Sequence, residues 1–198
     1  MAAQLVNQNG NEVTEQFTVK LTGSMLDDEQ ALQRSLNEAG QIAMAPMLEQ
    51  FDTHGKPVRV EGVKHTMRVR SPQTYETPYG PVQVERHVYQ NSKGGRVYVP
   101  LEHSARLALN STPRYSQIVA GKYARFGADA ICEDLLECNG RDISRNYAKK
   151  LSDFVGCIAQ CYESQWEYDL PEFDKPVAAI TLGLDGTCML MRQDGWRE

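Results

Sequence analysis

The spacing of apolar residues changes near residue 104 of this chain, from alternation to helical steps. Over residues 56–103 apolar and polar residues alternate, as at Val82, Val84 and Val88, which predicts half-buried strands. Over residues 104–162 the apolar residues recur at steps of three and four, which predicts amphipathic helices. A sheet segment followed by a helical segment places the fold in the α+β class.

Turn residues and composition divide the chain further. Residues 1–55 are predicted to hold a polar, loose arm and a helix, with Ser24 as its N-cap and Asp27 in its first turn. Residues 56–103 are predicted to form a small antiparallel sheet with turns at 77–81 and 91–95. Residues 163–176, which are acidic and contain two prolines, are predicted to be a linker, and residues 177–198 return to strand composition.

The overall composition is that of an ordinary globular protein, with 41% hydrophobic and 24% charged residues. No apolar run approaches the roughly 20 residues of a membrane span, so no membrane partner is expected. The N-terminus lacks the features of a signal peptide, and we expect a cytoplasmic protein. Its irregularly spaced thiols are then expected to be reduced and packed in the core. They are Cys132, Cys138, Cys157, Cys161 and Cys188.

The distribution of charge is more informative than its total. The net charge of −5 argues against a generic nucleic-acid binder. Residues 56–70 nevertheless contain five bases against Glu61, and residues 141–150 contain four bases against Asp142. Local clusters of this kind steer binding more than the net charge does. Charge alone, however, favours ordinary solvated faces over binding surfaces.

The helical region contains the outline of a helix-turn-helix. A short helix near residues 129–138 precedes Asn139 and Gly140, and a longer helix follows. In such motifs the first turns of the second helix enter the major groove of DNA. Arginine can pair with guanine, asparagine with adenine and lysine with phosphate. The predicted DNA-binding residues are Arg141, Ser144, Arg145, Asn146 and Lys149. The alternative is a plain helical hairpin with a solvated basic face.

One acid stands in the apolar run near the end of the chain. In a strand, Asp185 would lie on the face opposite Leu182 and Leu184. Asp-Gly between two apolar runs is a strong hairpin signal, so Asp185 could be the corner of a turn. If the turn instead lies at Asp194, Asp185 is in the middle of a strand and could bind a metal ion. The spacing of the residues leaves both interpretations open.

Several stretches occur in the order and at the spacing of one protein family. They are Tyr79-Gly-Pro-Val-Gln-Val-Glu-Arg-His-Val-Tyr, Tyr98-Val-Pro-Leu-Glu, Leu135-Leu-Glu-Cys-Asn-Gly, and Leu184-Asp-Gly-Thr with Gly195-Trp-Arg-Glu. Over roughly residues 30–198 the chain resembles the N-terminal part of a bacterial insertion-sequence transposase of the ISKra family. The resemblance implies that a ribonuclease H-like catalytic domain begins at residues 177–198. It also implies that Asp185 is the first acid of an Asp-Asp-Glu triad and a ligand of Mg²⁺.

The chain departs from the family pattern in two respects. Family members commonly carry a Cys-x-x-Cys zinc knuckle between the strands, but residues 90–95 contain no cysteine, so no zinc is expected there. The other two triad acids are not found in this chain. Two Mg²⁺ ions need several carboxylates, so we expect a truncated fragment that is inactive as given.

The function implied by the resemblance is binding of transposon-end DNA, with Mg²⁺-dependent cleavage and strand transfer only in the full-length enzyme. Two alternatives remain. The chain could be a non-catalytic protein that associates with full-length transposase and inhibits it, or the product of a decayed gene. A homo-oligomer is a further possible assembly.

Overall fold

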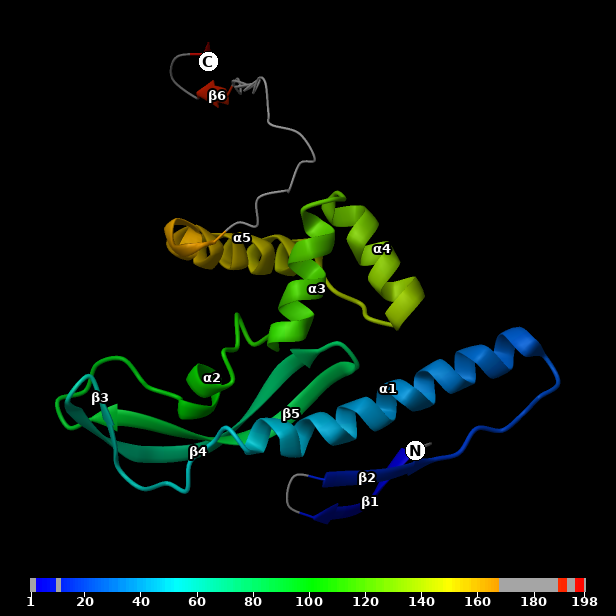
Figure 1. Ribbon diagram of the computed structural model, residues 1–198, viewed down its shortest axis with the longest axis horizontal. Helices are drawn as coiled ribbons and strands as arrows, with labels where there is room; N and C mark the ends of the chain where they lie inside the picture. The colour runs from blue at the N-terminus through cyan, green and yellow to red at the C-terminus, as the bar shows by residue number, and fades with distance from the viewer. Residues whose placement is uncertain (1–2, 10–11, 168–188, 192–194, 198) are drawn as a thin grey trace, which may run out of the picture. The chain divides into compact units, whose positions relative to one another are not determined.

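The computed structural model describes residues 3–9, 12–167, 189–191 and 195–197 (Figure 1). The chain divides into two compact units, Met1–Ser164 and Gln165–Glu198. In the second unit, β6 (Met189–Met191) and β7 (Gly195–Arg197) pair in antiparallel fashion. The first unit combines strands and helices, so the α+β prediction is confirmed.

The first part of the chain is a hairpin packed against a long helix. β1 (Ala3–Asn9) and β2 (Glu12–Phe17) pair antiparallel and contact α1 (Met25–Glu49). The expected loose arm is therefore wrong for these residues. Only Ala3 is buried among the described residues of the two strands. The hairpin therefore depends on backbone pairing, and its sequence lacks the alternation of apolar residues that would predict it.

Helix α1 begins at the predicted place, but the side chain of its N-cap residue makes no hydrogen bond to the helix. Ser24 occupies the N-cap without a side-chain hydrogen bond. Asp28 instead accepts hydrogen bonds from the Thr22 backbone N (2.8 Å) and Oγ1 (2.9 Å). Further along, a Cβ on Gly40 would collide with the ring of Tyr79. This close approach explains a glycine in the interior of the helix.

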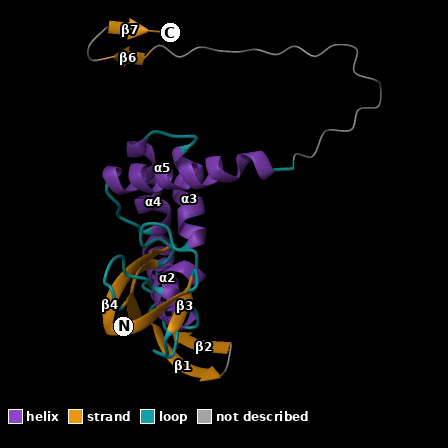
Figure 2. Cartoon of the chain, turned by 90° about the vertical axis from the view of Figure 1, so that its left-hand side faces the viewer, coloured by secondary structure: helices purple, strands orange, loops and turns teal. Residues whose placement is uncertain are grey.

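An antiparallel three-stranded sheet follows, as predicted (Figure 2). Its strands are β3 (Val58–Val60), β4 (Val63–Thr77) and β5 (Gly80–Asn91), in that order. The predicted turn after Thr77 is confirmed, because its Oγ1 accepts hydrogen bonds from the backbone N of Tyr79 and Gly80. After β5 the chain returns only as one bridge, between Tyr89 and Tyr98, before the short helix α2 (Pro100–Ser104).

Three helices complete the first unit: α3 (Pro113–Tyr123), α4 (Ala128–Asn139) and α5 (Arg145–Tyr162). Thr112 and Pro113 begin α3, and Gly140 ends α4 in a left-handed conformation (φ 63°), as predicted. Two clusters of buried residues form the core. The sheet cluster is Leu48, Tyr75, Val82, Val84, Val99 and Leu101. The helical cluster is Ala108, Tyr115, Val119, Ile131, Leu135, Ile143, Ala148 and Leu151.

The expected burial of the cysteines is wrong for three of the four that the structure describes, and Cys188 lies outside the described residues. Cys138, Cys157 and Cys161 are exposed, and Cys132 is half-buried. The reason for two of them is that the apolar stripe of α5 is covered only in its first half. Beyond Leu151, Phe154 (41% exposed) and Ile158 (44%) also face solvent. Among the described helices, none has the length and apolar character needed to cross a membrane.

Candidate nucleic-acid interface

The predicted DNA-binding residues surround the turn from α4 to α5. Two hydrogen bonds close the end of α4, from Gly140 N to Leu136 O (3.0 Å) and from Arg141 N to Leu135 O (2.9 Å). Such bonds satisfy carbonyls that the helix itself leaves unpaired. At the other side of the turn, Oγ of Ser144 accepts a hydrogen bond from Tyr147 N (3.1 Å). Ser144 therefore fixes the start of α5, which is worth about 1 kcal/mol for a typical N-cap.

Helix α5 is anchored by one face and exposed on the other. Ala148 and Leu151 are fully buried in the helical cluster. Arg145, Asn146 and Lys149 face solvent on the remaining surface of the first turns. Their helical spacing of one and four residues brings Arg145 and Lys149 onto neighbouring positions. The structure therefore brings these three predicted residues together.

Both cations of this surface have acidic neighbours. Arg145 forms an ion pair with Asp129 of α4, and Lys149 Nζ lies 2.8 Å from Oδ2 of Asp153. The hydrogen bond and the negative charge of Asp153 raise the pKa of Lys149 above its usual value. All four side chains are more than half exposed, so water and salt screen both pairs and they contribute little to stability. A phosphate group can therefore replace either acid at little cost.

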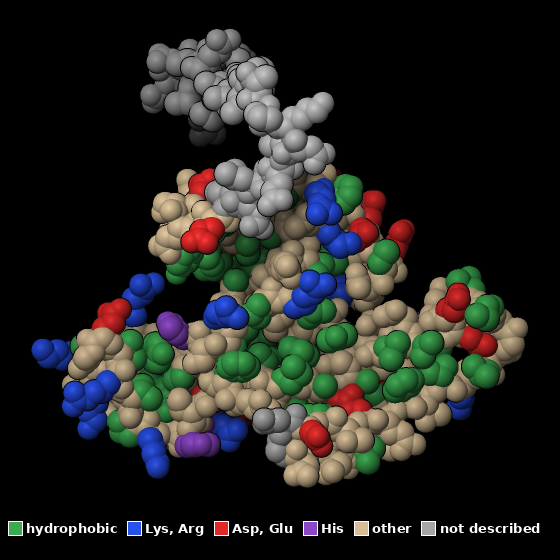
Figure 3. All heavy atoms as spheres, in the orientation of Figure 1, with side chains coloured by type: hydrophobic (Ala, Val, Ile, Leu, Met, Phe, Trp, Pro, Cys, Tyr) green, Lys and Arg blue, Asp and Glu red, His purple; other side chains and the backbone are tan. Residues whose placement is uncertain are grey.

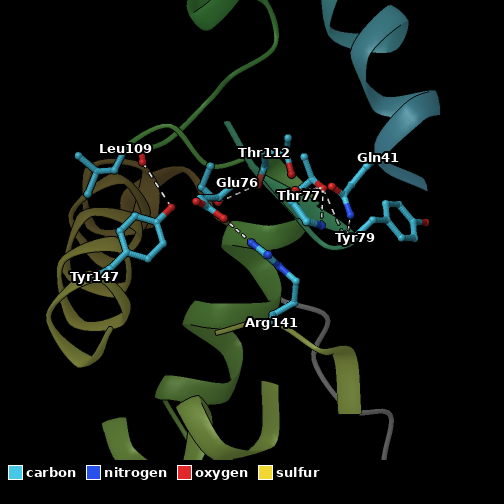
Figure 4. Close-up of polar contacts among 10 residues, drawn as sticks. Gln41, Glu76, Thr77, Tyr79, Leu109, Thr112, Arg141 and Tyr147 are labelled. Carbon is cyan, nitrogen blue, oxygen red and sulfur yellow. Dashed lines mark hydrogen bonds and ion pairs between the residues drawn. The ribbon is translucent and has the colours of Figure 1, made fainter. Parts of the chain in front are cut away.

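Arg141 lies in the interior of the unit, where its guanidinium points at Glu76 (Figure 4). It is 6% exposed, its guanidinium forms an ion pair with Glu76 of β4, and it stands 5.2 Å from the centre of the Tyr115 ring. A buried guanidinium with these partners joins the α4–α5 turn to the sheet and to α3. It is not presented to solvent beside Arg145.

Further contacts hold the helical region on the end of the sheet. Glu76 N donates to Asn110 O (2.7 Å), and Thr112 N donates to Glu76 O (2.9 Å). The hydroxyl of Tyr147 points at the carbonyl of Leu109 (3.4 Å), and burial raises the pKa of Tyr147 to about 12 (Figure 4). Asn37 of α1 donates to Asn139 O (2.9 Å). The turn before α5 is thus connected to α1 and to β4.

Sequence reasoning did not identify this junction, which we define as Glu76, Thr112, Tyr115 and Arg141. Glu76 and Arg141 lie 65 residues apart in the chain, and neither belongs to a local pattern that indicates the other. The one sequence feature that pointed to the junction was Arg141, a charged residue in a short turn between two helices. An arginine in that position is equally compatible with exposure to solvent.

Asp185, the predicted catalytic acid and Mg²⁺ ligand, lies outside the described residues. Within the part of the chain that is described, no three His, Cys, Asp or Glu side chains are grouped so that they could hold a metal ion.

Comparison with known proteins adds no assignment. No family model matches the chain, and a search of curated proteins finds no match.

Proposed function

We propose that this chain binds duplex DNA through α5, as the DNA-recognition part of an Asp-Asp-Glu transposase. In this proposal α4, residues 140–144 and α5 act as a helix-turn-helix. The observation that carries it is the exposed surface of Arg145, Asn146 and Lys149 on the first turns of a helix whose opposite face is buried.

The dimensions of this surface suit a groove of DNA. Residues 145–149 rise about 6 Å along the helix axis, and the major groove is about 12 Å wide. The positive end of the helix dipole lies at the same place and favours phosphate. We assign base contacts to Arg145 and Asn146, and a phosphate contact to Lys149.

Two further residues act through the position of the helix. Ser144 caps α5, and Arg141 holds the preceding turn against Glu76. Neither is proposed to contact DNA. They set the direction in which Arg145 and Asn146 leave the protein surface.

The reaction itself belongs to the complete enzyme in this proposal. The resemblance to the ISKra family implies that Asp185 and two further acids would hold Mg²⁺ for cleavage and strand transfer at transposon ends. Mg²⁺ would stabilise the attacking and leaving oxygens of the displaced phosphate.

Selection of binding sites from a random pool of duplexes tests the proposal. The wild-type chain is expected to enrich one sequence. Asn146→Ala should then lower the preference for that sequence over random DNA by about 1–3 kcal/mol, because an amide that reads adenine is lost. Its salt dependence should not change, because no charge is removed.

Gln160→Ala is the matched control, since it removes an exposed amide from the last turns of the same helix. It should bind as the wild type does. Enrichment of no sequence, or an Asn146→Ala variant that keeps the full preference, would contradict recognition by α5.

A second candidate function is association with full-length transposase without catalysis. The exposed side chains of Phe154, Ile158 and Tyr162 on the second half of α5 favour it. Purified full-length transposase should then bind the chain in the absence of DNA. The complex should survive Arg145→Ala with Lys149→Ala but weaken with Phe154→Ala and Ile158→Ala.

A further inference from the structure

Exposed basic side chains gather at the end of the sheet where β3 lies, at the left of the view in Figure 3. We call this surface the basic end. Its residues come from the loop before β3, from β3 and β4, and from the loop after β5: Lys56, Arg59, Lys64, Arg68, Arg70, Lys93 and Arg96. Along β4, Lys64 is twelve residues from Glu76, which corresponds to about 40 Å of extended strand. The basic end is therefore distinct from the junction that supports α5.

The bases of this surface lack acidic partners. Among the described residues, none of the seven forms an ion pair. The side chain of Asp52, which lies close to β5, is 7% exposed, and its Oδ2 lies 2.8 Å from Nδ1 of His87. Arg68 donates only to the backbone oxygen of Asn91, at 3.5 Å. The positive charge is thus left for a ligand, in contrast to Arg145 and Lys149 of α5, which both have acidic partners.

The strand register places two like charges opposite each other, and the resulting repulsion destabilises the fold. Arg59 stands directly opposite Lys64 across β3 and β4. Like charges in facing positions destabilise a strand pair. β3 has three residues, so few other contacts offset this repulsion. A bound anion between the two side chains would remove it.

The shape of the hairpin tip, which is the turn of Glu61 and Gly62 between β3 and β4, suits an extended polyanion. Glu61 and Gly62 both have positive φ (50° and 81°), which gives the tight two-residue turn of a twisted hairpin. A two-stranded ribbon of this kind fits the major groove of DNA. Lys64 and Arg70 are about 20 Å apart along the strand, whereas duplex phosphates repeat every 3.4 Å of rise on each strand. The bases therefore match a row of phosphates better than one small anion.

We propose that the basic end binds the phosphate backbone of duplex DNA without regard to sequence, as a second contact besides α5. This inference rests on the proposed function for the identity of the polyanion. Each phosphate that is neutralised releases counterions, so binding through this surface must weaken steeply as salt increases.

The test compares two variants that lose the same charge. Arg59→Gln, Lys64→Gln and Arg68→Gln together remove three bases from the basic end and also remove the repulsion across β3 and β4. Lys20→Gln, Arg34→Gln and Arg114→Gln together remove three exposed bases elsewhere. Affinity for a random-sequence DNA duplex is measured by fluorescence anisotropy over a series of salt concentrations, and circular dichroism checks the fold.

The basic-end variant is expected to reduce the slope of log K against log salt by about 2–3, since each lost phosphate contact contributes about 0.9. The control variant should keep the wild-type slope. Equal slopes in the wild type and the basic-end variant would overturn the inference. Vesicles of phosphatidylserine that bind the wild type, but not the basic-end variant, would assign the surface to a membrane if DNA binding were unchanged.

The two proposals can fail separately. If Asn146→Ala keeps full sequence preference while the basic-end variant shows the reduced salt slope, recognition by α5 is wrong and the basic end stands. If Asn146→Ala loses preference while the slope of the basic-end variant is unchanged, the reverse holds.

Discussion

At the scale of single residues, hydrogen bonding and burial change the titration of particular side chains. The hydrogen bonds from the Thr22 backbone and hydroxyl lower the pKa of Asp28 below its usual 3.8. In contrast, burial raises the pKa of the Cys132 thiol. Both shifts follow from neighbours, and both can be measured without knowledge of a ligand.

Asp28 is expected to stabilise the start of α1 only when it is ionised. Because its pKa is lowered by folding, this contribution is present above the unfolded value of 3.8 and is lost as the pH falls through the folded value. The difference in melting temperature between wild type and Asp28→Asn should therefore be constant well above pH 3.8. It should shrink as the pH falls through the lower pKa of the folded state. An NMR titration that placed the Asp28 midpoint above 3.8 would contradict this reading.

The cysteines are expected to differ in reactivity. Thiolate is the reactive form, so Cys132, half-buried and with a raised pKa, should be alkylated more slowly than the exposed Cys138, Cys157 and Cys161. Brief treatment of the native protein with iodoacetamide, followed by peptide mass spectrometry, measures each site. In denaturant the rates should converge, and a Cys132 that reacts first in the native state would contradict the burial.

At the scale of elements, two helical glycines provide a matched pair. Glycine in a helix interior normally costs about 1 kcal/mol relative to alanine. At Gly156 of α5 a Cβ would meet nothing within 4 Å, so Gly156→Ala should stabilise the protein by up to that amount. At Gly40 of α1 a Cβ would collide with the Tyr79 ring, so Gly40→Ala should destabilise by about 1–3 kcal/mol.

Urea denaturation of both glycine variants measures the difference. Replacing Tyr79 by alanine should abolish the penalty at Gly40, because the ring is its cause. Similar stabilisation by both alanine variants would show that the helix and the ring do not approach as described.

Local chemistry predicted most of the element boundaries. Thr112 before Pro113, Gly140 after α4 and the turn after Thr77 were all predictable, because capping and turn preferences act within a few residues. β1 and β2 were not, since most of their residues are exposed and their few apolar residues do not form a regular buried face. The cysteines of α5 were misplaced because the apolar period shows which face is apolar but not how far a neighbouring helix covers it.

At the scale of the whole molecule, the junction connects the sheet cluster to the helical cluster. Its ion pair could not be predicted from sequence, because partners 65 residues apart leave no local signal. The facing of Arg59 and Lys64 was predictable only in part. The sequence shows that both are basic, but whether they face each other depends on the position of the turn at Glu61. The exposure of Arg145, Asn146 and Lys149 was predictable. The spacing of apolar residues in α5 indicates which face is buried, and these three residues lie on the opposite face.

Arg141→Met is expected to lower the free energy of unfolding by about 2–3 kcal/mol, because it leaves the Glu76 carboxylate partly buried without its partner. Glu76→Gln in the same chain should restore part of the loss. Arg145→Ala, which breaks an exposed pair, is the control and should change stability by about 0.5 kcal/mol or less.

Hydrogen exchange then tests the connection between the clusters. In the wild type, the slowest amides of β4 and of α5 should open with similar free energies, whereas in Arg141→Met those of α5 should open more readily. Equal protection in the two proteins would mean that the junction does not couple the clusters.

The continuity of β4 has a mechanical consequence. The strand runs from Val63, beside the basic end, to Thr77, next to Glu76, and its pairing with β5 shifts register once, between Met67 and Val69. A force applied at the turn of Glu61 and Gly62 would be passed along the strand towards Glu76, with the bulge between Met67 and Val69 as the point where the strand bends. If the basic end binds DNA as proposed, the bound DNA would therefore act on the turn before α5 through β4.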